Sequence, residues 1–187
     1  DPAFTWLDME RFLRNSGLLD ARSLAASLGG SNDRGRALSP RGRQGLVTEV
    51  MAWSGLPLVP RDSHRVLLGE EIRELARRPG HAIGAHTTHH ALLPVHPLAM
   101  QRREMVACKA CLEALLGRPL RSLAYPYGEA SRETIAAARQ AGFCSALGTC
   151  TGLVRPWSDP LALPRVEVEA WPVAELARRL DALFRAG

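Results

Sequence analysis

Two histidines four residues apart are the residues of this chain best suited to carry chemistry. His86 and His90 follow a short apolar run over residues 82–85. Positions i and i+4 lie on one face of a helical turn, so the spacing predicts that both imidazoles reach a single ion at roughly 2.0–2.1 Å. Neutral imidazole is the commonest metal ligand, and two such rings make up two thirds of a zinc site. The alternative is that these histidines are solvent-facing or capping features of a polar turn.

A second candidate segment begins 35 residues after His90. There, another apolar run ends in the turn Tyr125-Pro126-Tyr127-Gly128. Proline and glycine favour a turn at this place, because proline presets its backbone angle and glycine accepts a positive one. Taken alone, the segment also fits a structural turn whose aromatic side chains are packed.

Together, the two segments resemble the polysaccharide deacetylases, the NodB-homology group of carbohydrate esterases. The family motif H-(S/T)-x-x-H matches residues 86–90, which puts its two metal histidines at His86 and His90 and leaves His89 as a bystander. The next family motif, an aromatic followed by P-(Y/W)-G, matches residues 125–128. The similarity runs from about Gly69 to Val168. Either motif alone is weak, but their order and spacing make the pair specific.

The resemblance implies a metal-dependent hydrolase that removes N-acetyl, or less often O-acetyl, groups from a sugar of a bacterial polysaccharide or glycan precursor. A divalent metal, expected to be zinc, would lower the pKa of a bound water toward about 7 and polarise the acetyl carbonyl. The backbone N–H of Tyr127 would donate to the resulting oxyanion, which makes Tyr127 a catalytic candidate. Tyr125, Pro126 and Gly128 are the corresponding substrate-binding candidates. The expected partner is a carbohydrate that carries an acetamido sugar.

The chain departs from the family in motifs that carry chemistry. The first family motif, T-F-D-D-G, supplies the catalytic base and the third metal ligand, but no two aspartates are adjacent in this sequence. Ala124 stands where many relatives have an arginine, and the late L-x-H motif with its general acid is replaced by L-P-R, ending at Arg165. Arg165, the second catalytic candidate, either orients a carboxylate from the absent beginning or pairs with Glu167 or Glu169. We infer that the sequence begins downstream of the first motif, or that the motif has been lost.

Two other functions are compatible with these residues. In the first, the chain is a catalytically inactive, deacetylase-like domain that binds carbohydrate but lacks the base aspartate. In the second, it is a metal-binding structural piece of a larger glycan-modifying enzyme. An Asp-Asp-Gly strand upstream of Asp1 would distinguish the enzyme from the inactive domain. A tightly held zinc ion with no open coordination position would favour the structural piece.

The elements that must position these residues alternate between helices and short apolar runs. Helical periods cover residues 7–14, 45–53, 69–78, 98–116, 131–141 and 173–184, and strand-like runs cover residues 82–85, 121–125, 144–147 and 163–168. This rhythm predicts an α/β fold with a parallel sheet and right-handed crossovers. With the resemblance, it predicts an irregular parallel (β/α) barrel of the polysaccharide deacetylase type, incomplete at the N-terminus. Because the carboxyl ends of barrel strands share one face, His86, Tyr127 and Arg165 are expected to meet there.

Length and composition indicate a single domain over residues 1–187. The 46% hydrophobic content is ordinary for a globular protein, and no run of about 20 apolar residues predicts a membrane span. The net charge is +5, of which residues 28–45 contribute four arginines and one aspartate, or 4 − 1 = +3. This Arg- and Gly-rich segment is expected to be a flexible loop. Because the remaining charge is nearly balanced and Lys109 is the only lysine, nucleic acid is not an expected partner.

The four cysteines are expected to be free thiols. Cys108 and Cys111 lie inside a helical period, whereas a C-x-x-C zinc site needs a turn. Cys144 and Cys150 fit a buried strand and its exit. A core of this size has no need of a disulfide framework, and free thiols favour a reducing compartment such as the bacterial cytoplasm.

Overall fold

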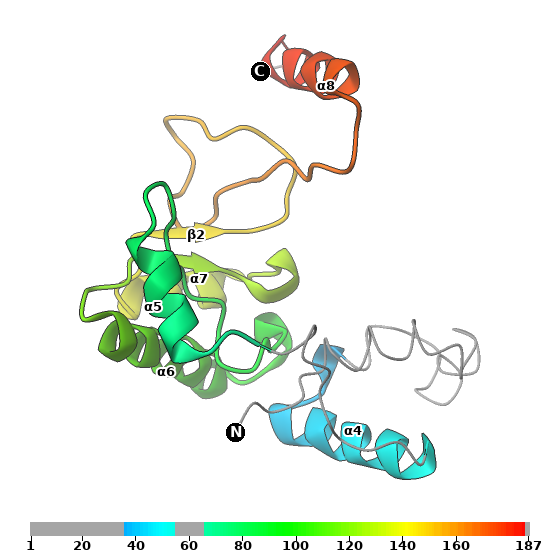
Figure 1. The fold of residues 1–187 in the computed structure, drawn as a ribbon, viewed down its shortest axis with the longest axis vertical. Coiled ribbons are helices and arrows are strands. Elements are labelled where there is room, and N and C mark those ends of the chain that lie inside the picture. The colour runs from blue at the N-terminus through cyan, green and yellow to red at the C-terminus, as the bar shows by residue number, and fades with distance from the viewer. Residues whose placement is uncertain (1–35, 55–65, 186–187) are drawn as a thin grey trace. The chain divides into compact units, whose positions relative to one another are not determined.

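The computed structural model describes residues 36–54 and 66–185, and Figure 1 shows its ribbon. Contacts between Cα atoms divide the chain into two compact units, Asp1–Arg77 and Arg78–Gly187. Each unit has its own helices, and the strands found in the described residues belong to the second. The organisation of the whole chain as one domain stays a prediction. The helix expected over residues 7–14 lies outside the described residues.

The first described helix, α4 (Pro40–Ser54), begins inside the segment that was expected to be a flexible loop. Ser39 Oγ accepts a hydrogen bond from the backbone N–H of Gly42 at 3.1 Å, which is the geometry of an N-terminal cap. Pro40 follows the cap, where its missing N–H costs no helical hydrogen bond. The loop prediction is therefore wrong from Pro40 to Gly45, and residues 28–35 lie outside the described part.

The next described helix, α5 (Gly69–Arg77), agrees with the predicted helix over residues 69–78. Glu71 Oε2 accepts a hydrogen bond from the backbone N–H of Leu68 at 2.6 Å, just before the helix. Acidic residues in the first turn and Arg77 in the last turn complement the helix dipole.

The second unit is organised around a short parallel sheet. Strands β1 (Ser122–Ala124) and β2 (Ser145–Leu147) pair in parallel, and single parallel bridges add Ala85 beside Leu123 and Leu163 beside Leu147. The two central strands confirm the runs predicted over residues 121–125 and 144–147. The strands predicted over residues 82–85 and 163–168 are reduced to these single bridges. In the part of the chain that the structure describes, the sheet has two paired strands, and a closed barrel is not shown.

Helices α6 (Leu98–Leu116) and α7 (Arg132–Gln140) connect the parallel segments and pack against each other. The segments follow one another across the sheet in chain order, so right-handed crossovers put both helices on the same side, as Figure 1 shows. Gly117, with φ at 64°, ends α6 in the left-handed conformation. Ser131 Oγ caps α7 by accepting from the N–H of Thr134 at 3.2 Å.

The core of this unit lies between the sheet and these helices. The middle residue of each strand is buried and its neighbours are half-buried, because side chains alternate between the two faces of a sheet. The helices contribute Met105, Ala137 and Ala138, and the buried cluster also contains Ala85, Leu93, Leu120, Leu123, Tyr125, Phe143, Ala146 and Leu161. The four cysteines are free, as predicted, although Cys144 is exposed rather than buried.

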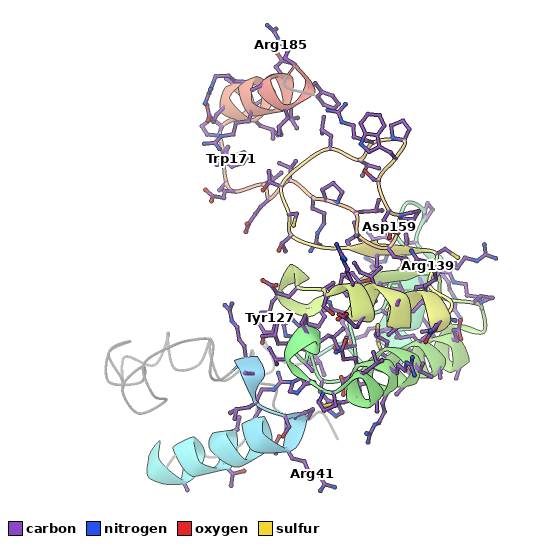
Figure 2. All side chains as sticks on the ribbon, turned by 180° about the vertical axis from the view of Figure 1, so that it is seen from behind. Arg41, Tyr127, Arg139, Asp159, Trp171 and Arg185 are labelled. Carbon is purple, nitrogen blue, oxygen red and sulfur yellow. The ribbon has the colours of Figure 1, made fainter. Side chains whose placement is uncertain are left out.

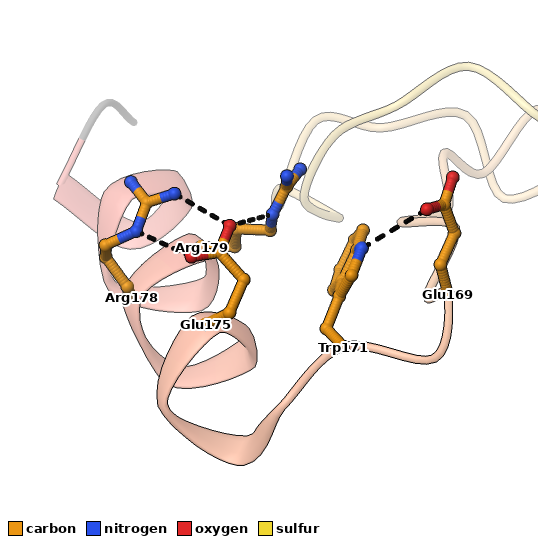
Figure 3. A network of polar contacts seen from close by, with 5 residues as sticks. All are labelled: Glu169, Trp171, Glu175, Arg178 and Arg179. Carbon is orange, nitrogen blue, oxygen red and sulfur yellow. Dashed lines mark hydrogen bonds and ion pairs between the residues drawn. The ribbon is translucent and has the colours of Figure 1, made fainter.

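The last helix, α8 (Val173–Arg185), has a group of polar contacts in its first two turns. Glu175 binds Arg178 through two hydrogen bonds of 2.7 and 2.9 Å and Arg179 through one of 2.6 Å, as Figure 3 shows. The guanidiniums of Arg178 and Arg179 lower the pKa of Glu175 to about 2. The guanidinium of Arg179 also lies 4.2 Å from the ring centre of Trp171. None of the described helices is long and apolar enough to cross a membrane.

Tyr125, which directly precedes the turn Pro126–Gly128, belongs to the core and bonds to the segment that follows β2. Its exposed fraction is 1%, and its hydroxyl donates to the carbonyl of Leu161 at 2.9 Å. Burial raises the pKa of Tyr125 to about 12 because the phenolate would lose hydration.

Raising the pH above 10 is expected to weaken the fold through Tyr125. The phenol ionises near pH 10 in an unfolded chain but near 12 in the folded protein, so the folded state retains a proton that the unfolded state has lost. This contribution to stability is complete below pH 10 and disappears as the pH rises toward 12. Urea unfolding at a series of alkaline pH values measures it.

The matched variant is Tyr125→Phe, which keeps the ring and removes the titrating group. It is expected to lose about 1 kcal/mol of unfolding free energy at neutral pH, because the Leu161 carbonyl loses its donor. Its alkaline decline should be smaller than that of the wild type. An unchanged decline would show that Tyr125 is not the titrating group.

Candidate functional site

The candidate site lies where neighbouring parallel segments end. Ala85, Ala124 and Leu147 are the last residues of three adjacent segments of the sheet, and residues 86–90, the turn 125–128 and Gly148 follow them. The N–H of Ala124 donates to the carbonyl of Ala85 at 2.9 Å, so the first two segments stay paired to their ends. The carboxyl ends of parallel strands lie on one edge, which brings the two sequence motifs together.

Three rings meet at this edge. The ring centres of His86 and His90 are 4.7 Å apart, and those of His90 and Tyr127 are 4.6 Å apart, both pairs in edge-to-face contact. Figure 2 shows Tyr127 on the turn that follows β1. The structure therefore brings together the histidine pair and the aromatic turn, which are separated by 35 residues in sequence.

One hydrogen bond orients the first imidazole. His86 Nδ1 lies 2.7 Å from the carbonyl oxygen of Ala124. A carbonyl only accepts, so Nδ1 carries the proton and the lone pair of the neutral ring is on Nε2. A ligand imidazole whose other nitrogen donates to a backbone carbonyl is the usual outer support of a metal site.

The backbone at the site is not helical, contrary to the prediction. Residues 86–90 form an irregular segment in which Thr87 and His90 have φ angles of 64° and 52°. Tyr127, in the motif turn, has a φ of 60°. These are the three non-glycine residues with positive φ in the described part of the chain, and all belong to the two motifs. Such conformations cost of order 1–3 kcal/mol each and cluster at functional sites, and a β-branched threonine is an especially unfavourable case.

His89 binds a residue of α6, and its place as a bystander of the metal histidines stays a prediction. Its ring Nδ1 lies 2.7 Å from Oε1 of Glu104 on α6, and its backbone N–H donates to Oε2 of the same carboxylate at 2.8 Å. Glu104 is a residue at the site that was not predicted from the sequence. A signal existed, since Glu104 and Gln101 fall on the helical stripe that also contains Met105 and Cys108, where a charged residue is unexpected.

The motif turn Pro126–Gly128 depends on its glycine. Gly128 has a φ of 73°, and a Cβ at this position would lie 2.1 Å from Thr149 Oγ1. The hydroxyl of Thr149 donates to the carbonyl of Tyr127 at 3.2 Å, which fixes the turn from the loop after β2. Thr149 is the second site residue that the sequence analysis missed.

The candidate substrate-binding residues differ in their exposure. The side chains of Tyr125 and Pro126 are buried, and the Tyr125 hydroxyl is engaged by Leu161. The role of both residues in substrate binding stays a prediction. Gly128 is half-buried, and its role stays a prediction.

Arg165 lies on the segment beyond β2. Its backbone N–H donates to the carbonyl of Cys150 at 2.9 Å, and its Nε donates to the carbonyl of Gly148 at 2.6 Å. Among the described residues it forms no ion pair with Glu167 or Glu169, which was one of its two predicted roles. Its guanidinium instead ties this segment to the end of β2, next to the turn.

The two imidazoles fit part of a metal site. Both rings belong to one short segment, and the bond from His86 to Ala124 leaves Nε2 as the coordinating nitrogen. No group of three histidine, cysteine, aspartate or glutamate side chains is arranged to hold an ion within the described ranges. The donor set that the described residues present is therefore a pair of imidazole nitrogens, a ligand type that zinc accepts.

Comparisons with known proteins agree with the sequence resemblance. Residues 57–146 match the family model described as polysaccharide deacetylase. The search of curated proteins found no match. Among solved structures, a Streptococcus pyogenes deacetylase, PplD, in complex with acetate is similar, with a TM-score of 0.58 and 22% identity over 65% of this chain and 53% of that chain.

Two further structures are similar to the same extent. A polysaccharide deacetylase from Bacillus cereus has a TM-score of 0.55 and 24% identity over 63% of this chain and 37% of that chain. IcaB from Ammonifex degensii has a TM-score of 0.54 and 22% identity over 66% of this chain and 55% of that chain. These likenesses establish the deacetylase fold, and the chain spans between 37% and 55% of the length of the three neighbours.

Replacing Gly128 with alanine is expected to destabilise the protein by about 2 to 5 kcal/mol, because the methyl group adds a steric clash with Thr149 to the cost of a positive φ. The matched control is Gly117→Ala, where φ is 64° and no atom lies within 4 Å of the new Cβ. This control should cost only about 1 to 2 kcal/mol. Urea unfolding measures both, and equal costs would contradict the packing of Thr149 on the turn.

Proposed function

Since the chain belongs to the polysaccharide deacetylase family through residues 57–146, we propose that it is a hydrolase that removes acetyl groups from the amino groups of a polysaccharide. The observation that carries the proposal is the meeting of His86, His90 and Tyr127 at one edge of the parallel sheet. The two family motifs are therefore in contact through the rings of His90 and Tyr127. The alternative of an inactive carbohydrate-binding domain gains no support from the family match or from the neighbouring folds.

His86 and His90 are the residues that would hold a divalent metal, which we expect to be zinc. When bound, such an ion supplies a water of lowered pKa and polarises the acetyl carbonyl. The chain's own contribution is to present two neutral imidazole nitrogens in a fixed orientation. The Ala124 carbonyl fixes the tautomer of His86, and the positive φ of His90 turns its ring toward both His86 and Tyr127.

The turn after β1 would stabilise the charge that develops during hydrolysis. Cleavage of an acetamide adds water across the C–N bond and yields acetate and a free amine, with negative charge building on the acetyl oxygen. We assign the backbone N–H of Tyr127 as a donor to this oxygen, because Tyr127 belongs to the family's motif turn and its ring contacts His90. One such preorganised donor contributes about 3 to 4 kcal/mol to transition-state stabilisation.

Arg165 and Gly128 support this part of the site. Arg165 donates to the Gly148 carbonyl, and Gly148 packs against the carbonyl of Gly128 so closely that an added Cβ would lie 3.2 Å from it. Arg165 therefore stabilises the loop after β2, which packs on the motif turn. The substrate class that fits is a carbohydrate with acetamido groups.

Alanine at either histidine is expected to abolish the activity. His86→Ala and His90→Ala each remove a metal ligand, so acetate release from an N-acetylated polysaccharide should fall by more than about 100-fold, and bound zinc should be lost. Acetate release and zinc content of the native polypeptide are the measurements. His81→Ala is the matched control, because His81 is also an exposed imidazole whose Nδ1 lies 3.1 Å from a backbone carbonyl, that of Pro79.

The control should keep both zinc and activity. Retention of both in either His86→Ala or His90→Ala would refute the assignment of the pair. Activity with O-acetylated but not N-acetylated polymers would keep the site and correct the substrate.

A further inference from the structure

Glu104 is a buried carboxylate with no part in the proposed chemistry. It lies on α6, and its exposed fraction is 5%. Burying a carboxylate is costly unless hydrogen bonds compensate for the lost hydration. Its partners should therefore indicate what the residue does.

Outside its own helix, Glu104 forms hydrogen bonds with the segment between the two candidate ligands. Its Oε2 accepts the backbone N–H of His89 at 2.8 Å, and its Oε1 accepts Nδ1–H of the His89 ring at 2.7 Å. Its backbone carbonyl accepts the hydroxyl of Thr88 at 3.3 Å. One helix residue thus holds two consecutive loop residues through three hydrogen bonds.

The segment needs such support because of its backbone. Thr87 and His90, which flank the residues bound by Glu104, have φ angles of 64° and 52°. A non-glycine residue keeps such a conformation only where its surroundings over-determine it. The bond from His86 to Ala124 holds the beginning of the segment, and the bonds from Thr88 and His89 to Glu104 hold its middle.

We propose that Glu104 is the positioning residue of the histidine pair: it clamps Thr88 and His89 to α6 so that His86 and His90 face the same point. The part of this inference that concerns metal binding rests on the proposed function. Glu104 acts through the loop and not as a ligand, because both of its oxygens are taken by His89 and no three-ligand group occurs among the described residues.

The variant Glu104→Gln tests the clamp with little change in size. Its amide oxygen can accept the backbone N–H of His89, but its NH₂ group then faces Nδ1 of the ring, so the second bond is lost unless the His89 ring changes to the Nε2–H tautomer. The matched control is Glu113→Gln on the same helix. Glu113 also accepts a backbone N–H, that of Leu120 at 2.8 Å, but binds no residue of the site.

Two measurements are made on each protein. The first is the NMR spectrum of the backbone amides of residues 87–90 and of the His86 and His90 imidazoles, without metal. The second is zinc affinity by calorimetry. For Glu104→Gln, we expect shifted and broadened loop resonances and a loss of zinc affinity of about 10- to 100-fold, the usual effect of losing an outer support. Glu113→Gln should leave the loop spectrum and the zinc affinity unchanged.

The outcomes separate this inference from the proposed function. If the wild type binds no zinc, the metal part of the proposed function fails, and the metal-free spectra still decide whether Glu104 orders the loop. Wild-type spectra and zinc affinity in Glu104→Gln would overturn the positioning role. A disturbed loop with unchanged zinc affinity would overturn its link to the histidine pair.

His89→Ala provides a second variant should Glu104→Gln fold poorly. The His89 side chain is 55% exposed, so its removal leaves no internal cavity, and the backbone bond to Glu104 can persist. We expect the same changes in the loop spectrum, with a smaller loss of zinc affinity. No change in either measurement would count against the clamp.

Discussion

The candidate site depends on the backbone pairing between Ala85 and β1. Ala85 donates to Ser122 and accepts from Ala124, both at 2.9 Å, and the carbonyl of Ala124 then accepts Nδ1–H of His86. The strand pairing therefore sets the orientation of the first imidazole. Gly84 permits this close approach, since a Cβ there would lie 2.9 Å from Ser122 Oγ. A slip of one residue in this register would move His86 to the opposite face of the sheet.

The geometry beyond these strand ends is built from strained backbone and its supports. Thr87 and His90 turn the chain so that a four-residue spacing brings two rings together without a helix, and Tyr127 turns the neighbouring segment toward them. Each strained residue has a support nearby: Glu104 for the histidine segment and Thr149 for the tyrosine turn. The supports come from α6 and from the loop after β2, whose positions are fixed by the core. The packing of the helices on the sheet therefore determines how the three rings are oriented.

The sequence predicts the regular elements of this unit better than the site itself. The helical period over residues 98–116 matches α6, and the apolar runs at β1 and β2 are correct, because burial on one face produces a periodic pattern. The convergence of the two motifs follows from parallel topology. By contrast, positive φ angles at a threonine, a histidine and a tyrosine have no local sequence signal, since these residues disfavour that conformation. The clamp by Glu104 joins residues 15 positions apart, and only the fold brings them together.

A donor set of two imidazoles increases the importance of this preorganisation. Each ligand that must be ordered on binding reduces the affinity by the entropy lost, and a third protein ligand would offset part of that loss. Within the described residues no third histidine, cysteine, aspartate or glutamate side chain joins His86 and His90, so the affinity supplied by this part of the chain depends on how well the pair is held beforehand. The bond from His86 to Ala124 removes the rotational freedom of one ring, and the clamp on His89 restricts the backbone that carries the other. The buried carboxylate of Glu104 is therefore costly for the fold but advantageous for the site, which explains its presence on the apolar stripe of α6.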